Sequence, residues 1–446
     1  MAYTSKDGNR PFEYASKISH THIINDPTVS EFLRHGDIPK KAADVIIPEE
    51  NIKIYKPASH NPITQIIAID GGFEEIPVQT EFPSSKICFF QFGILAFSIN
   101  DLETINDEPF IQPEDIAKLK QIERIKFTLP VNNFSYKEEP TITHSVRRAV
   151  YDFFSQKNNE DKPLNDTLKW FIFREYSAPL PSWNLSSCPY CFTSDITLER
   201  TKISKDYTFT CPACNGEIFL TDVFRLHEAI DDNLGAGGIF GYVTTTFEQI
   251  LLVHVIRLIL NLKPSLLNSV FFIKDGPLAF FGQTANMHKP MRNLINYLFD
   301  FENLYLAGLE KSGPFVEHAN QISEKLEPGT ILLLNNDYIY KYVIPGKADP
   351  NNPYGRTTYY GNKLIFKSKN QGVHVITVPT TSLLSNPSIE DLRNLQVILT
   401  NVEKLKCDMY DNALMPVALA NKLISLSQYP SSKILQRFAT TEILDK

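Results

Sequence analysis

The chain has 446 residues, of which 43% are hydrophobic and 21% are charged. This ordinary globular composition argues against disorder and predicts two or three domains, or one large core with insertions. The 44 basic and 51 acidic residues give a net charge of -7, which argues against a uniformly basic nucleic-acid coat protein. The N-terminus lacks an apolar signal region, and the most apolar helical run, Phe247–Leu262, is short and carries charges, so we expect no membrane span.

In chain order, the predicted elements begin with a helix around Val29–Val45, followed by polar linkers that contain proline. The pattern changes at Ile66, where the apolar run IIAID ends at Asp70 and meets two glycines, a sequence typical of a strand and a glycine turn. The next run, Lys86–Ile99, is rich in β-branched and aromatic residues and is long enough for one or two strands. These runs predict the start of a sheet.

Beyond a more polar, helical stretch, the chain contains a cysteine-rich module, a glycine-rich loop and a predicted long helix, Thr244–Leu262. Strands then alternate with helices, which predicts an α/β fold with a mixed sheet flanked by helices. The later predicted strands are Val270–Gly276, Leu304–Leu309, Thr330–Leu334, Lys363–Lys367 and Val373–Val378. The predicted divisions are an N-terminal helical and linker segment (1–60), the first part of the core (61–100), a mostly helical insertion (101–182), the cysteine-rich module (183–220) and the remainder of the core with C-terminal helices (221–446).

Two CxxC pairs, CPYC at 188–191 and CPAC at 211–214, are the most specific local signal in the chain. Each pair places two thiolates on one tight turn, and two such turns complete a tetrahedral sulfur site suited to Zn²⁺. A redox dithiol is the functional alternative, but two pairs of matched spacing disfavour it. Four ligands leave no open position, so we expect a structural zinc ion on Cys188, Cys191, Cys211 and Cys214. Cysteines used in this way also indicate a reducing, cytoplasmic environment.

Two acidic residues, Asp70 and Asp275, each end a predicted apolar strand and precede glycine. A carboxylate at a strand tip beside glycine is a recurrent metal ligand, although an aspartate that starts a turn gives the same pattern. The occurrence of two such residues on strands of one sheet favours the metal interpretation.

Glu248 lies on the apolar face of the predicted helix Thr244–Leu262. A lone buried carboxylate is costly unless it is paired or binds a metal, whereas a glutamate near a helix start is also favoured by the helix dipole. If Asp70, Glu248 and Asp275 converge at a sheet edge, they form the oxygen-donor set that Mn²⁺ or Mg²⁺ requires. Such a set supports two-metal phosphoryl hydrolysis.

With these residues in place, the chain resembles the NurA nuclease family. AIDGG at 68–72 is similar to the family's first motif, IKDGPL at 273–278 to its strand-ending DGPL motif, and Glu248 to its helical glutamate. AGLEKSG at 307–313 resembles the strand-and-lysine element that follows. The resemblance covers most of the chain from about residue 60 onward. It implies an RNase H-like fold, Mn²⁺-dependent exonuclease and endonuclease activity on DNA, and a homodimer docked on HerA, a hexameric DNA-translocating ATPase.

Two features depart from the family pattern: Asn421 stands where the last helix usually carries a histidine, and the cysteine-rich module is an insertion. Asp411 is a weaker candidate for the missing ligand. The chain has no nucleotide-hydrolysing loop, since PGKA at 345–348 lacks the required Ser/Thr and the upstream glycine, so an ATP-driven step needs a partner.

The leading hypothesis is a metal-dependent DNA nuclease that works with a HerA-like ATPase in DNA end processing or antiviral defence. The alternative is a catalytically lapsed subunit that binds DNA or the ATPase without cutting. Basic residues could contact DNA, with tyrosines among them for base stacking, although solvated surface charge is the commoner role. The candidates are Arg147, Arg148, Lys289, Arg292, Arg356, Lys363, Lys367 and Lys369, with Tyr354, Tyr359 and Tyr360.

Overall fold

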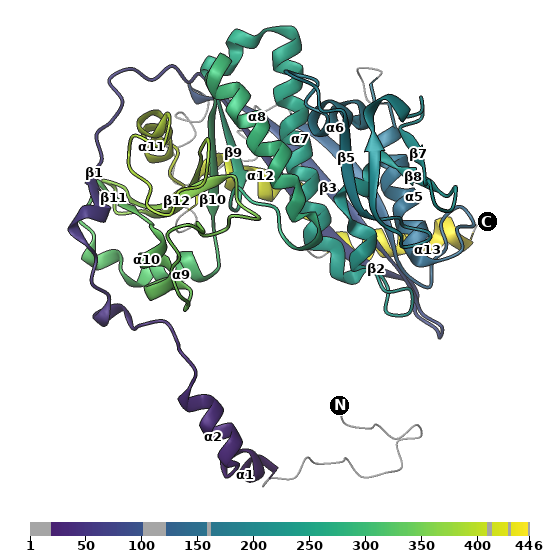
Figure 1. The fold of residues 1–446 in the computed structure, drawn as a ribbon, viewed down its shortest axis with the longest axis horizontal. Helices are drawn as coiled ribbons and strands as arrows, with labels where there is room; N and C mark the ends of the chain where they lie inside the picture. Colours follow the sequence, from purple (N-terminus) through teal and green to yellow (C-terminus); the bar gives the residue numbers. More distant parts are fainter. Residues whose placement is uncertain (1–18, 101–121, 158–161, 408–412, 427–429, 445–446) are drawn as a thin grey trace.

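The computed structural model describes residues 19–100, 122–157, 162–407, 413–426 and 430–444. Within these residues the largest element is a mixed sheet of nine strands (Figure 1). In spatial order the strands are β1 (Ile52–Ile54), β11 (Thr330–Leu333), β12 (Gly361–Lys367), β13 (Val373–Pro379), β10 (Tyr305–Glu310), β9 (Val270–Asp275), β2 (Gln65–Gln79), β3 (Ser85–Ser98) and β4 (Ile122–Asn132).

The centre of the sheet combines antiparallel and parallel pairing. Strands β2, β3 and β4 form an antiparallel meander, whereas β9 pairs in parallel with β2, and β10 in parallel with β9. Parallel strands are covered on both faces, which explains why β9 and β10 are almost continuous runs of buried residues. The order β4-β3-β2-β9-β10 is the RNase H-like arrangement. The predicted fold class is therefore confirmed.

Helices cover both faces of this sheet and define two hydrophobic clusters. The first cluster contains residues of α5 (Ile142–Ser155), α6 (Leu164–Ile172), α7 (Phe240–Leu262) and α8 (His288–Phe301). The second contains residues of α11 (Leu395–Lys404) and α12 (Met415–Ile424). The remaining described α-helices are α1 (Ser19–Ile24), α2 (Pro27–Arg34), α9 (Pro314–Gln321), α10 (Asn336–Tyr338) and α13 (Ser431–Leu444).

The long helix α7 is the main support of the central strands. The segment Gly237–Leu262, with a mean hydropathy of 1.5, is long and apolar enough to cross a membrane by length and composition alone. In this fold, however, 61% of its apolar window is buried inside the protein, where it packs in the first hydrophobic cluster. Its composition is therefore that of a core helix.

Strand β2 differs from its prediction in one respect that matters for the site. It continues through both glycines as far as Gln79, so Asp70 lies within a long strand instead of at the strand tip. Glycine suits this part of β2 because neighbouring residues leave little room for a side chain. A Cβ at Gly71 would meet the Phe92 ring at 2.7 Å and Thr244 Cγ2 of α7 at 3.0 Å. Glycine at this position lets α7 approach the strand.

Two other elements also differ from expectation. Strand β4 runs through the segment that was predicted to be mostly helical; residues 101–121 of that segment lie outside the described residues. The alternation of Phe127, Leu129 and Val131 with less apolar residues is the two-residue period of a strand. The helix expected over Val29–Val45 is the shorter α2, which begins after its N-cap residue Asp26.

Candidate functional site

The cysteine-rich module consists of two β-hairpins, each with a CxxC turn at its tip. Strands β5 (Ser182–Ser187) and β6 (Ser194–Glu199) flank the first turn, and β7 (Thr208–Thr210) and β8 (Glu217–Phe219) flank the second. The two turns have matching hydrogen bonds: Phe192 N–H donates to the Cys188 carbonyl, and Asn215 N–H donates to the Cys211 carbonyl, both at 3.0 Å. Both donors have positive φ angles, of 59° and 60°.

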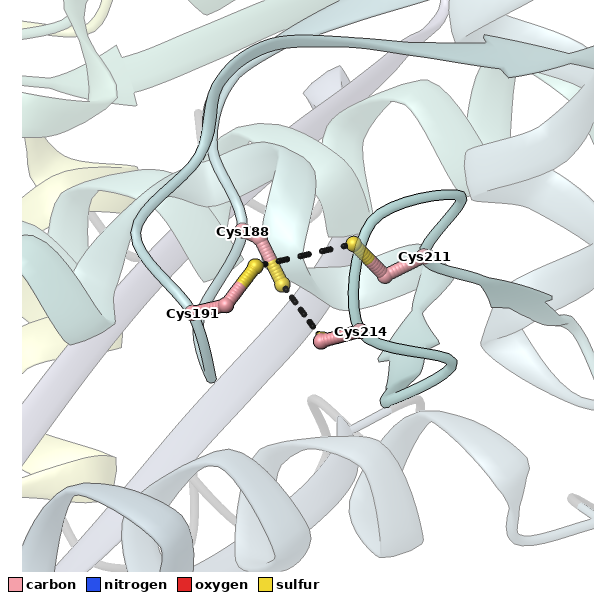
Figure 2. A group of neighbouring side chains, drawn as sticks. All are labelled: Cys188, Cys191, Cys211 and Cys214. Atoms are coloured by element: carbon pink, nitrogen blue, oxygen red, sulfur yellow. Dashed lines mark hydrogen bonds between the residues drawn. The ribbon is translucent and has the colours of Figure 1, made fainter.

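The four cysteine sulfurs meet in one cluster (Figure 2). All four lie within 4.8 Å of one another, and the Cys188–Cys214 and Cys191–Cys211 sulfur pairs are 3.8 Å apart. A tetrahedron with zinc–sulfur bonds of about 2.3 Å has edges of about 3.8 Å. The same distance is far too long for a disulfide. The predicted convergence of these cysteines is confirmed, and the cluster could hold a metal ion such as Zn²⁺.

A buried arginine ties this module to the core. Arg147 on α5 donates from Nε and Nη2 to the two carboxylate oxygens of Asp222, at 2.8 Å each, and both side chains are almost fully buried. The guanidinium also lies 4.8 Å from the ring centre of Tyr190 in the first CxxC turn and 4.9 Å from that of Phe219 at the end of β8. Arg147, a predicted DNA contact, is therefore a structural residue.

Other predicted DNA contacts are also buried. Tyr360 and Lys363 are 0% and 3% exposed. The Lys363 ammonium is paired with Glu310, and the Tyr360 hydroxyl donates to Gln249 of α7 at 2.6 Å. Tyr360 therefore cannot stack on a base at the surface, and Lys363 cannot reach a phosphate there.

Asp70 and Asp275 lie side by side on the two central parallel strands. The β2–β9 pairing runs from Gln65 and Val270 to Ile69 and Lys274, so Asp70 and Asp275 are the next residues on each strand. After Asp275 the chain turns away at Gly276, whose φ of 85° favours glycine. The two carboxylates therefore occupy the point where β2 and β9 separate.

Burial and a neighbouring negative charge perturb Asp70. Its side chain is almost fully buried, and this burial together with the charge of Asp275 raises the pKa of Asp70 to about 7. The charges of Lys311 and Lys274 and a 2.9 Å hydrogen bond from Gly71 N–H oppose the increase. A bound cation would strongly favour the ionised form of a carboxyl group whose pKa is raised in this way.

Glu248 projects toward the same place from α7. Burial raises its pKa to about 8; Lys274 opposes this shift, and the charges of Asp70 and Asp275 add to it. The Gly71 N–H, which donates to Asp70 Oδ1, also acts to lower the pKa of Glu248. The fold thus brings the three predicted carboxylates into electrostatic contact, and their role as catalytic metal ligands stays a prediction.

Two lysines lie in this centre: Lys274 was missed by the sequence analysis, and Lys311 belongs to the strand-and-lysine element at 307–313 but was given no role there. Lys274 Nζ lies 3.6 Å from Glu248 Oε2 and donates to the Asp275 carbonyl at 2.6 Å. Lys311 Nζ, just after β10, lies 2.7 Å from Asp275 Oδ2. The sequence could have revealed Lys274, because it is a cationic residue in an otherwise apolar strand.

The donor set fits a hard divalent cation in its chemistry. Three carboxylates, two with strongly raised pKa values, supply oxygen ligands whose mutual repulsion a cation would relieve. Among the described residues, however, the group whose ligand atoms could hold a metal ion is the four cysteines, and the three carboxylates do not form such a group in the ion-free structure. Lysine ammonium groups pair with two of these carboxylates, Glu248 and Asp275.

Helix α12, the last helix expected to contribute to the site, packs on β2. Ile424 of α12 covers Gly72 and Gly93, whose missing Cβ atoms would lie 3.3 Å from its carbonyl oxygen and 2.6 Å from its Cγ2. Asn421 lies one turn earlier and is exposed. Asp411, the other candidate from this region, lies outside the described residues.

No protein-family model matches the chain, and no curated protein sequence matches it. Among solved structures, the chain is similar to the NurA nuclease from Sulfolobus solfataricus, with 8% identity and a TM-score of 0.33 over 97% of this chain and 99% of that chain. At this identity and TM-score the likeness carries no argument about activity.

Proposed function

We propose that this protein is a divalent-metal-dependent deoxyribonuclease. The observation that carries the proposal is the convergence of Asp70, Glu248 and Asp275 on adjoining elements of an RNase H-like sheet, where their charges act on one another. The DNA substrate is supported by the AIDGG and IKDGPL motifs, which resemble those of the NurA nucleases. The Cys₄ module would hold a structural zinc ion.

Each residue of the centre has a distinct task in this proposal. Asp70 and Asp275, on adjacent strands, would ligate Mn²⁺ or Mg²⁺, with Glu248 as the third ligand from α7. Such an ion supplies activation of water and stabilisation of the leaving oxygen. Gly71 N–H orients Asp70 through the hydrogen bond that it donates to Oδ1. Lys274 compensates the buried charge of Glu248.

We also propose a cellular setting for this activity. The motif resemblance favours a homodimer that acts in the cytoplasm with a HerA-like hexameric ATPase, in DNA end processing or antiviral defence. The sequence of this chain contains no nucleotide-hydrolysing loop, so translocation would depend on that partner. The net charge of -7 agrees with weak capture of DNA by the nuclease alone.

A second candidate function is a catalytically lapsed subunit that binds DNA or the ATPase without cutting. Asn421, in place of the histidine of the resembled family, favours this alternative. The burial of Asp70 and Glu248 favours the enzyme, because buried carboxylates are costly unless they are paired or bind a metal.

The test is cleavage of end-labelled linear DNA in Mn²⁺, with and without the cognate ATPase, by wild type and by Asp70→Asn. We expect cleavage by wild type that EDTA abolishes and that the variant lacks. As a control for a general effect of replacing an aspartate, Asp166→Asn changes a carboxylate that accepts a hydrogen bond from Tyr207 of the cysteine-rich module, and this variant should cut like wild type. Wild type that fails to cut in either condition, while still binding DNA or the ATPase, would support the lapsed subunit instead.

A further inference from the structure

The two lysines of the carboxylate centre differ in their freedom to move. The Lys274 side chain is 5% exposed, and its ammonium group is held by Glu248 and by the Asp275 carbonyl. The Lys311 side chain is 31% exposed, and its ammonium group contacts Asp275 Oδ2 at 2.7 Å. Lys274 is therefore a fixed counter-charge, whereas Lys311 can leave its partner at little cost, because exposed ion pairs contribute little stability.

The backbone around Lys311 is built to keep it beside Asp275. Residue Leu309 of β10 is paired with Asp275, and its carbonyl accepts a hydrogen bond from Gly276 N–H. A Cβ at Gly308 would lie 2.7 Å from the Gly276 carbonyl oxygen, so glycine is needed for the close approach of β10 to this turn. Lys311 follows directly, and its charge acts on Asp70 as well as on Asp275.

The partner of Lys311 is also an oxygen that a divalent ion at this site would use. An ammonium group and a divalent cation cannot both contact one carboxylate oxygen without strong mutual repulsion. Lys311 and Asp275 are the more exposed side chains of this centre, at 31% and 22%, so a backbone phosphate of DNA would reach the carboxylates from their side. Lys363 of β12 cannot take this role because its side chain is 2% exposed and paired with Glu310.

We propose that Lys311 and a divalent cation compete for the Asp275 carboxylate, and that the displaced Lys311 binds a phosphate of the DNA backbone. This inference rests on the proposed nuclease function and adds a substrate-binding residue to it. Lys311 holds the carboxylate in the ion-free protein and contributes positive charge to DNA binding once the ion is bound.

The experiment measures two affinities that should change in opposite directions in Lys311→Met. Titration calorimetry gives the affinity for Mn²⁺, and fluorescence anisotropy with Ca²⁺ in place of Mn²⁺ gives the affinity for a short DNA duplex as a function of salt. The matched control is Lys202→Met, which removes a lysine from another 2.7 Å ion pair, with Glu199 in the cysteine-rich module. Lys311→Arg keeps the charge, and thermal melting verifies that each variant folds.

We expect Lys311→Met to bind Mn²⁺ about two- to fivefold more tightly, the range that one exposed ion pair provides. Its DNA affinity should fall, and the slope of log affinity against log salt should decrease in magnitude by about 1, the loss of one phosphate contact. Lys311→Arg should keep the wild-type slope of log DNA affinity against log salt. The inference is wrong if Lys311→Met matches Lys202→Met in both measurements while wild-type protein binds Mn²⁺ and cuts DNA. If wild type does neither, the nuclease proposal fails, and this inference fails with it.

Discussion

Arg147 and Asp222 form a two-hydrogen-bond ion pair in which the side chains are 2% and 3% exposed. Burial alone would raise the pKa of Asp222, but the Arg147 charge and its hydrogen bonds hold it below the usual value. Asp222 also accepts a hydrogen bond from Phe219 N–H at 2.8 Å. The pair thus joins α5 to the strand that carries one side of the cysteine-rich module.

Removing one member of this pair should be strongly destabilising. Asp222→Asn leaves the Arg147 guanidinium buried without its counter-charge, and we expect the free energy of unfolding to fall by about 3–5 kcal/mol. Urea denaturation measures this change. Glu199→Gln, which breaks the exposed pair with Lys202, is the control and should change stability by less than about 1 kcal/mol. Equal effects of the two substitutions would contradict the structural role of the buried pair.

Loss of the bound metal should unfold the cysteine-rich module before the core. Cys211→Ser combined with Cys214→Ser removes one CxxC turn, and because the hairpins are short, the metal is expected to supply much of their folding energy. We expect one zinc per wild-type chain by elemental analysis, and none in the double variant. Limited proteolysis should then cut the variant within residues 183–220. A wild-type protein without zinc, or a variant with an unchanged protease pattern, would refute the structural zinc site.

The parts of this fold that the sequence predicted are those encoded locally. The CxxC pairs each form within four residues, and their matched spacing is visible without any tertiary information. Asp70 and Asp275 were found because an apolar strand and a glycine adjoin each of them. Strand β4 was missed although its alternation was present; Pro130 interrupts the pattern, and this is tolerated because β4 is an edge strand.

The parts that the sequence could not predict depend on register and packing between distant segments. Lys311 meets Asp275 only because β9 and β10 pair in parallel with Leu309 opposite Asp275. Arg147 and Asp222 are 75 residues apart and come together only when α5 packs against the end of the module. No local pattern marks an arginine as buried, so a surface role for Arg147 was the natural prediction.

A buried histidine should make stability fall in mild acid. His318 of α9 is 6% exposed, contacts the Tyr338 hydroxyl at 2.9 Å, and has a pKa lowered by burial to about 4. The unfolded chain binds this proton at about pH 6.5, so its contribution to stability is present above pH 6.5 and is lost as pH falls toward 4. At pH 5 the loss is about 2 kcal/mol.

Urea denaturation at pH 7 and pH 5 tests this assignment. His318→Gln, which keeps a polar group near Tyr338, should lose less stability between the two pH values than wild type does. His60→Gln is the control, because His60 lies in a linker far from His318 in the sequence. This variant should keep the wild-type difference in stability between the two pH values. An unchanged pH dependence in His318→Gln would show that other groups cause the acid sensitivity.

Asp70 should lower the stability of the metal-free protein although it is needed for activity. The pKa of Asp70 is raised in the folded state to about 7, so without metal its contribution to stability is lost as pH rises from about 4 to 7. Asp70→Asn removes the ionisable group and its repulsion with Asp275. We therefore expect this variant to melt at a higher temperature than wild type at pH 8 in EDTA, with a gain on the order of a few kcal/mol at most.

The same substitution should abolish most of the activity. Replacing Asp70 or Asp275 by Asn keeps the shape of the side chain but removes the charge that would hold a divalent ion, and we expect DNA cleavage in Mn²⁺ to fall by on the order of 10²-fold or more. Single-turnover cleavage of linear DNA measures the rate, and melting in EDTA gives the stability of the same samples. Lower activity with lower stability would indicate a structural role for these aspartates. Near wild-type cleavage by both folded variants would place the active site elsewhere in the molecule.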